Sequence, residues 1–125
     1  DEDVYTKCRF IVQENQRLHD AVEAFKNKDM VELGQLLFKA HWALSKEYEV
    51  SCPELDFLVS QAENNEFVVG ARMMGGGFGG CTINLIKKGN TESFINTLSP
   101  AYKEKFNLEL TPIKVKISNG TSMLL

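Results

Sequence analysis

A glycine-rich loop is the part of this sequence with the clearest capacity for chemistry. Residues 74–81 read Met-Gly-Gly-Gly-Phe-Gly-Gly-Cys, and five of the nine glycines of the chain fall within positions 75–80. Glycine adopts backbone angles that are closed to other residues and lets backbone N–H groups come close to a ligand. Successive N–H groups of this kind can form a concave anion site. The candidates for contact with a phosphate group or a nucleotide are therefore Gly75, Gly76, Gly77, Phe78, Gly79 and Gly80.

Several interpretations of this loop compete. Gly75, Gly77 and Gly80 meet the pattern G-x-G-x-x-G, but a dinucleotide fold needs a helix after the loop, and residues 82–86 are strand-like instead. A Walker-type phosphate loop is also excluded, because no Gly-Lys-Ser/Thr follows. Two alternatives stay open: contact with phosphate, and a tight or bulged hairpin that needs glycine for steric reasons only. Phe78 is interpreted as a plug that packs the loop down rather than as a residue that stacks on a base.

Few side chains outside the loop suggest chemistry. Arg72 lies on the strand that leads into the loop, where its guanidinium could contact phosphate or another domain, or form a structural salt bridge beneath the sheet. His41 falls on an apolar helix stripe, where a hydrogen-bonded packing role is favoured over catalysis. Asp56 and Glu54 are interpreted as carboxylates stabilised by a helix dipole rather than as bases. The residues thus suggest no catalytic set and no metal site.

The hydrophobic pattern predicts the helices that must support the loop. Steps of three, four or seven residues predict a first helix of about 25 residues. Its predicted buried stripe is Val4, Cys8, Ile11, Leu18, Val22 and Phe25. A capping box at residues 29–32 predicts the start of a second helix. A third, short helix is predicted to begin with a cap at residues 51–54, with Pro53 in its first turn.

The period then changes from helical to strand-like. Strands are predicted at 67–74 and 81–86, followed by a helix at 91–106 that Pro100 should kink or restart. Residues 113–117 alternate between apolar and polar and predict a half-buried strand. The last five residues are expected to add a turn and a short strand. The order αααββαβ predicts an α+β fold, with helices packed on a small, mostly antiparallel sheet.

Composition bounds the function classes. The chain has 125 residues, which predicts one domain, and its net charge of −3 without a basic cluster argues against a nucleic-acid partner. No apolar run approaches the length of a membrane span, so no membrane association is expected. The three cysteines include no CxxC pair, which argues against a disulfide framework and a zinc site. A reducing, cytoplasmic location is therefore expected.

Three stretches together resemble one protein family. Residues 70–82, Gly-Ala-Arg-Met-Met-Gly-Gly-Gly-Phe-Gly-Gly-Cys-Thr, closely resemble the third signature motif of galactokinases, which belong to the GHMP small-molecule kinases. Residues 47–56, preceded by His41 and Leu44, are similar to the family stretch H-x-x-L-x-x-x-Y-x-V-S-x-P-E-L-D. Residues 9–17 are similar to the preceding family helix. The order and spacing of all three agree, and the resemblance covers nearly the whole chain.

The resemblance implies a ferredoxin-like GHMP kinase C-terminal domain over residues 1–125, with the N-terminal ATP-binding domain absent from this chain. It implies a transferase that moves the γ-phosphoryl group of ATP to the anomeric hydroxyl of galactose with Mg²⁺, in a cleft between the two domains. The loop at 75–80 would lie near the nucleotide phosphates. The family's first motif, G-R-x-N-L-I-G-E-H-x-D-Y, and its second, P-x-x-x-G-L-S-S-S-A, are absent. The catalytic residues are therefore expected in the N-terminal domain, and this chain alone is expected to be inactive.

Two alternatives to this function stay open. Relatives of galactokinases can bind galactose and ATP yet act as non-catalytic sensors, and others phosphorylate a related sugar such as N-acetylgalactosamine. The residues that decide between these functions lie outside the matching part of the family. Met74 also departs from the threonine that is usual at this position, which removes a hydroxyl next to the loop.

Overall fold

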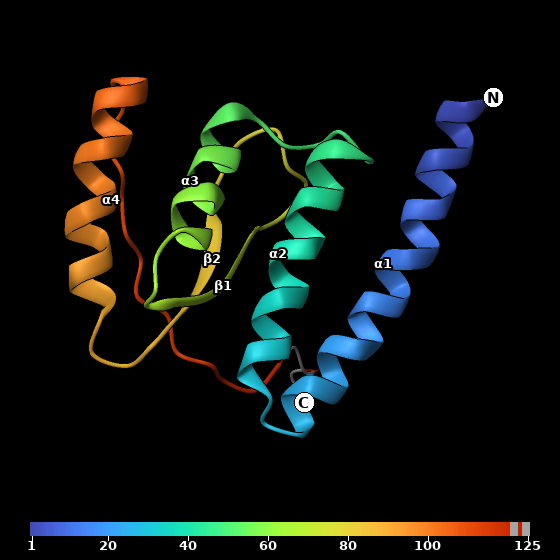
Figure 1. Cartoon of the computed structure of the whole chain (residues 1–125), viewed down its shortest axis with the longest axis horizontal. Helices are drawn as coiled ribbons and strands as arrows, with labels where there is room; N and C mark the ends of the chain where they lie inside the picture. Colours follow the sequence, from blue (N-terminus) through green and yellow to red (C-terminus); the bar gives the residue numbers. More distant parts are fainter. Residues whose placement is uncertain (121–122, 124–125) are drawn as a thin grey trace.

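Four helices and one antiparallel hairpin make up the part of the chain that the structure describes (Figure 1). The computed structural model describes residues 1–120 and residue 123. The elements, in chain order, are α1 (Glu2–Lys26), α2 (Met30–Lys46), α3 (Pro53–Glu63), β1 (Val68–Met73), β2 (Thr82–Ile86) and α4 (Thr91–Phe106). The α+β class and the first six predicted elements are confirmed.

The helix starts follow mostly from local sequence. The Asp29 side chain accepts a hydrogen bond from the Glu32 N–H at 2.9 Å, so the predicted cap of α2 is confirmed. Helix α3 begins at Pro53, but its N-cap, Cys52, makes no side-chain hydrogen bond, so the predicted cap at 51–54 is wrong in detail. Pro100 lies inside α4, which continues through it from Thr91 to Phe106 without a restart.

Strands β1 and β2 form a two-stranded antiparallel sheet joined by the glycine-rich loop. Their register places Met73 opposite Thr82 and Val68 opposite Ile86, with an irregularity between Val68 and Gly70. Helices α2 and α3 pack on the sheet, whereas α1 and α4 lie on opposite flanks (Figure 1). The loop therefore emerges from a hairpin that two helices hold in place.

Helix α2 approaches β1 unusually closely at two glycines. A Cβ added to Gly70 would lie 2.4 Å from the Cα of Gly34, and one added to Gly34 would lie 1.9 Å from the carbonyl oxygen of Val69. Any side chain at either position would push the helix off the strand. Glycine is therefore required here for close backbone approach rather than for a special φ.

The core lies between α3, the hairpin and α4. Its buried members include Val59, Ala71 and Phe94, which are no more than 4% exposed. Aromatic rings attach α4 to α3, because Phe57 lies against Phe106 with ring centroids 5.4 Å apart. No residue of the loop at 74–81 belongs to this core.

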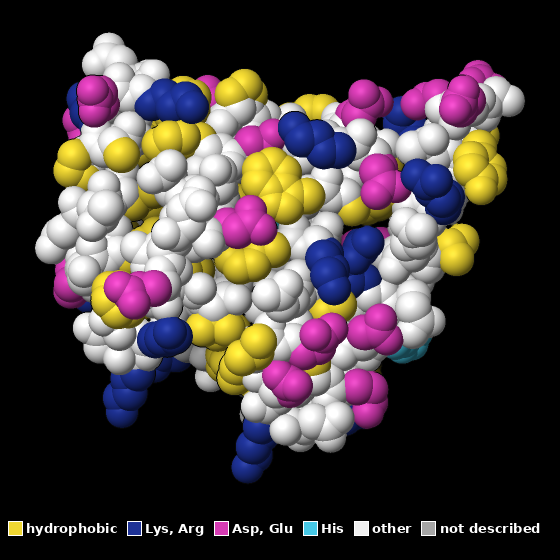
Figure 2. Space-filling model, viewed as in Figure 1, with side chains coloured by type: hydrophobic (Ala, Val, Ile, Leu, Met, Phe, Trp, Pro, Cys, Tyr) yellow, Lys and Arg dark blue, Asp and Glu magenta, His cyan; other side chains and the backbone are white. Residues whose placement is uncertain are grey.

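The predicted buried stripe of α1 is wrong. All six of its residues are exposed, including Leu18 at 63% and Phe25 at 53%. Phe10 and Ala24 are the buried residues of this helix, and the Phe10 ring stacks on Tyr48 with centroids 4.7 Å apart. Figure 2 shows hydrophobic side chains along the outer edge of α1. Periodicity identified an apolar face, but the position of α2 decides which face is covered.

The strand predicted at residues 113–117 is also wrong in this structure. These residues form no helix or strand, and Ile113, Val115 and Ile117 are between 73% and 88% exposed. Alternation makes a segment suitable for half-burial, but a strand also needs a neighbour that pairs with its backbone. No strand pairs with it within residues 1–120. The turn and strand expected at the end of the chain fall largely outside the described residues.

One further property concerns membranes. None of the helices in the described part is both long enough and apolar enough to cross a bilayer.

Candidate functional site

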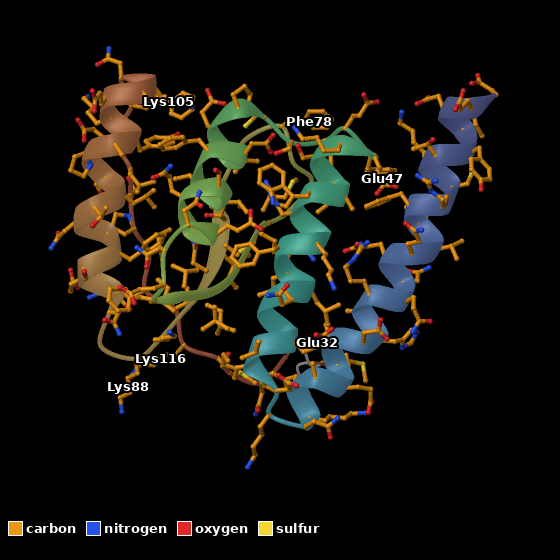
Figure 3. All side chains as sticks on the ribbon, viewed as in Figure 1. Glu32, Glu47, Phe78, Lys88, Lys105 and Lys116 are labelled. Atoms are coloured by element: carbon orange, nitrogen blue, oxygen red, sulfur yellow. The ribbon has the colours of Figure 1, made fainter. Side chains whose placement is uncertain are left out.

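The glycine-rich loop connects the two strands at one end of the molecule. Its base is closed by a hydrogen bond from the Met74 N–H to the carbonyl oxygen of Cys81, at 3.0 Å. Figure 3 shows Phe78 at the end of the molecule where α2 finishes and α3 begins. The loop therefore lies beside the segment that links these two helices.

The loop backbone has a conformation that most residues avoid. The φ angles of Gly75, Gly77, Gly79 and Gly80 are 72°, 85°, 133° and 91°. Phe78 also has a positive φ, of 59°, which costs an L-residue about 1–2 kcal/mol. The hairpin interpretation of the glycines is therefore consistent with the backbone geometry.

The amide groups of the loop remain largely free. The Phe78 N–H donates to the carbonyl oxygen of Val50 at 2.7 Å. The amides of the five loop glycines donate to no partner within the described residues. Residues 74–81 line an open depression. Free N–H groups around a depression can accept an anion, so the geometry also keeps the phosphate interpretation open.

Exposed, largely apolar side chains line this depression together with the glycines. Phe78 is 75% exposed and Met74 is 46% exposed, and Cys81 is also exposed. The interpretation of Phe78 as a plug of the loop is wrong, because three quarters of this side chain is exposed rather than packed. Together these side chains form a mixed surface beside free backbone amides.

Arg72 makes structural contacts. Its Nε donates to the carbonyl oxygen of Met73 at 3.0 Å. Its Nη1 lies 3.8 Å from Oε1 of Glu14 on α1, and Glu14 also pairs with Arg17. The salt-bridge alternative therefore describes where this guanidinium lies. Contact of Arg72 with phosphate or with another domain stays a prediction.

His41, a buried histidine of α2, contacts the end of β1 next to the loop. His41 is completely buried, its Nδ1 lies 3.2 Å from the Met73 nitrogen, and its Nε2 lies 3.2 Å from Oδ1 of Asp56. The expectation of a hydrogen-bonded packing histidine is confirmed. Its ring thus connects α2, α3 and the last residue of β1.

Asp56 gathers more partners than its place in the sequence suggested. Its carboxylate accepts hydrogen bonds from the hydroxyl groups of Ser51 at 2.6 Å and Ser45 at 2.8 Å, besides its contact with His41. Lys46 Nζ lies 3.7 Å away. Sequence reasoning treated Asp56 as a first-turn carboxylate and missed this cluster, because its members come from three separate segments.

The pKa values of His41 and Asp56, the two ionisable groups at the centre of this cluster, are both shifted from their ordinary values. Burial lowers the pKa of the His41 imidazole from its usual 6.5, although the Asp56 carboxylate opposes this effect. Burial raises the pKa of Asp56, but the hydrogen bonds from Ser51 and Ser45 lower it, and the pKa ends below its usual 3.8. At neutral pH the pair is therefore a neutral imidazole beside a carboxylate.

The buried histidine predicts that stability falls in mild acid. Below pH 6.5 the unfolded chain protonates His41 while the folded chain keeps it neutral, so acid favours unfolding. The free energy of unfolding should fall as the pH drops below 6.5, by at most about 1.4 kcal/mol per pH unit. Urea unfolding at several pH values measures this slope.

A matched variant isolates the contribution of His41 to that slope. His41→Asn removes the titrating ring and retains His19, which is exposed. Asp56 contributes little to the slope just below pH 6.5, because the stability that its lowered pKa provides is lost only as the pH falls toward 3.8 and below. An unchanged slope in His41→Asn would contradict the assignment.

The loop fits the phosphates of a nucleotide better than it fits a metal. Within the described residues no group of three or more His, Cys, Asp or Glu side chains could hold a metal ion. The residues that line the depression, 74–81, include no carboxylate. Backbone N–H donors match phosphate oxygens, whereas Mg²⁺ prefers oxygen ligands.

Comparison with known proteins gives consistent matches. The family model of GHMP kinases C terminal matches residues 21–104. The chain is 41% identical to a galactokinase of Thermotoga neapolitana, over 94% of this chain and 34% of that protein. It is 39% identical to a galactokinase of Bacillus subtilis, over 94% of this chain and 30% of that protein. The chain thus spans about a third of the length of these curated relatives.

A solved structure matches as well. The galactokinase of Lactococcus lactis, crystallised in complex with galactose, aligns with a TM-score of 0.84 and 37% sequence identity. The alignment covers 87% of this chain and 28% of that one. The fold predicted from the sequence motifs is therefore confirmed.

Proposed function

This chain belongs to the GHMP kinase family as its C-terminal domain, and from that premise we propose that it is the C-terminal part of a galactokinase. The proposed reaction transfers the γ-phosphoryl group of ATP to the anomeric hydroxyl of galactose. The proposed partners of the chain are an N-terminal ATP-binding domain of the same polypeptide and the sugar substrate. Residues 1–125 would form one domain of that enzyme.

The free loop amides carry this proposal. They belong to the five glycines of residues 75–80, in the stretch that resembles the third galactokinase motif, and these residues line an open depression. Phosphoryl transfer depends mainly on positioning and on stabilisation of charge at the phosphate oxygens. Backbone N–H groups held in a fixed loop supply both, without a titrating side chain.

The contribution of this chain to catalysis would be to bind the nucleotide phosphates and to exclude water from the cleft. The loop amides would hold nucleotide phosphates, and the apolar side chains of Met74 and Phe78 would cover the closed cleft. Water exclusion strengthens electrostatic interactions within a closed site. Mg²⁺ would neutralise phosphate charge when bound. Its ligands are expected from the other domain, because no carboxylate lines the loop.

Catalytic turnover by the complete protein is the direct test. We expect the product of the complete open reading frame that encodes this chain to release ADP from MgATP when galactose is present. The 125-residue chain alone should release none, because the loop supplies phosphate contacts but no catalytic base. A coupled ADP assay, with galactose and N-acetylgalactosamine in parallel, measures this.

Each other result of that assay, taken together with a binding titration of the same protein, replaces the proposal with one alternative. Turnover with N-acetylgalactosamine only would identify a kinase of a related sugar. Binding of ATP and galactose without turnover would identify a non-catalytic sensor. Turnover by the 125-residue chain alone would show that this domain holds the catalytic residues.

A further inference from the structure

The buried His41 ring has one hydrogen-bonding arrangement that satisfies its neighbours. The Met73 N–H can only donate, so His41 Nδ1 must accept this bond and carry no hydrogen. The hydrogen of the neutral ring is then on Nε2, which faces Asp56 Oδ1 at 3.2 Å. The ring is completely buried, so no water competes for either contact. The tautomer is therefore determined by the backbone of β1.

This contact fixes the first attachment point of the loop. Met73 is the last residue of β1 and lies opposite Thr82 in the hairpin register. The next residue, Met74, donates to Cys81 across the hairpin, so the Met73 N–H faces the other way, toward α2. His41 therefore holds the edge of β1 immediately before the loop begins.

A second contact fixes the far side of the loop. The Phe78 N–H donates to the carbonyl oxygen of Val50 at 2.7 Å. Gly77 lies so close that an added Cβ would be 2.0 Å from the same oxygen. Val50 precedes Ser51, whose hydroxyl donates to Asp56 at 2.6 Å. Both attachment points of the loop are therefore linked to the Asp56 carboxylate. Met73 is linked to it through His41, and Val50 through the next residue, Ser51.

The negative charge of Asp56 suits a group that links the two attachment points of the loop. The groups near the His41 ring are Asp56, Arg72 and Glu63, and those near Asp56 are Lys46 and the two serine hydroxyls. Hydrogen bonds from Ser51 and Ser45 hold the pKa of Asp56 below its ordinary value despite burial. An ionised carboxylate only accepts hydrogen bonds, so all three donors meet it without a competing O–H donor.

We propose that His41 and Asp56 are positioning residues that hold the glycine loop, through Met73 on one side and Val50 on the other, in the conformation that binds nucleotide phosphates. This inference rests on the proposed function, because it assumes that the loop meets a phosphate. Neither residue would touch the substrate. Their effect would reach the nucleotide through the loop backbone.

Two substitutions of His41 separate this role from a general packing role. His41→Asn retains an acceptor near the Nδ1 position and loses the donor to Asp56. His41→Gln retains a donor near the Nε2 position and loses the acceptor for the Met73 N–H. Each variant loses one hydrogen bond of a buried ring, so general destabilisation should be similar in both. A packing role alone would therefore affect the two equally.

The expected result is a difference in nucleotide affinity. In the product of the complete open reading frame, His41→Gln should raise the KM for MgATP about tenfold, as loss of one buried hydrogen bond to the loop strand implies. His41→Asn should largely rescue it, and the KM for galactose should stay unchanged in both. Equal KM values for MgATP in the two variants would overturn the inference.

A spectroscopic measurement keeps the inference testable if a variant fails to fold. In the wild-type protein, imidazole ¹H–¹⁵N spectra should show the His41 hydrogen on Nε2, with the Met73 amide protected from exchange. A hydrogen on Nδ1 would overturn the inference. This readout does not depend on kinase activity, so a protein without turnover but with the expected tautomer would refute the proposed function alone.

Discussion

Replacing Gly34 by alanine is expected to destabilise the protein by about 3 kcal/mol, through overpacking against β1. The added Cβ would lie 1.9 Å from the carbonyl oxygen of Val69 and 2.6 Å from its carbonyl carbon. These are backbone atoms of a paired strand and cannot rotate away. Helix α2 would have to move, which would also stretch the His41 contact to Met73.

The sign of this effect is opposite to the sign that helix propensity alone predicts. In an ordinary helix interior, glycine to alanine stabilises by about 1 kcal/mol, because alanine has the higher helix propensity. Gly34 lies inside α2, so intrinsic propensity and tertiary packing predict opposite signs. Urea unfolding of Gly34→Ala measures the balance. A gain in the free energy of unfolding would show that α2 does not approach β1 as closely as the structure indicates.

Replacing Gly77 by alanine is expected to break the hydrogen bond between the Phe78 N–H and the Val50 carbonyl oxygen, which attaches the loop to the segment before α3. The φ of Gly77 is 85°, and an added Cβ would lie 2.0 Å from the Val50 carbonyl oxygen and 2.7 Å from the Met73 methyl group. Backbone strain and steric overlap together should cost about 3 kcal/mol. If the loop binds phosphate as proposed, the KM for MgATP should rise at least tenfold as well.

Gly76 offers a matched control within the same loop. An alanine Cβ at this position meets no atom within 4 Å, and its φ is not in the left-handed region. Gly76→Ala should therefore change the free energy of unfolding by less than about 0.5 kcal/mol. Unfolding curves and MgATP titrations of both variants make the comparison. Equal effects of the two substitutions would refute the contact between Gly77 and Val50.

Local features of the sequence determined much of this fold. The Asp29 cap, the proline that begins α3 and the glycine loop between two strand-like segments all predicted the elements that the structure contains. These features act over a few residues, so they can be interpreted without a partner segment. The motif around the loop was also specific enough to identify the family, which the comparisons confirm.

Two errors share a physical cause. The apolar stripe of α1 was expected to be buried, and residues 113–117 were expected to form a strand, but both are exposed. A periodic pattern states which side chains share a face. It does not state which other element lies against that face, or whether a strand edge is available to pair with it.

The candidate site likewise has a part that the sequence predicted and a part that only the tertiary structure shows. The sequence alone determined that residues 75–80 form a glycine-dependent loop between strands, because glycine content and strand patterns are local properties. Only the tertiary structure showed that His41 contacts Met73 and that Asp56 gathers two serine hydroxyls. These groups come from α2, α3 and the segments beside the loop. Their contacts exist only because the close approach at Gly34 and Gly70 brings α2 onto the strand that carries the loop.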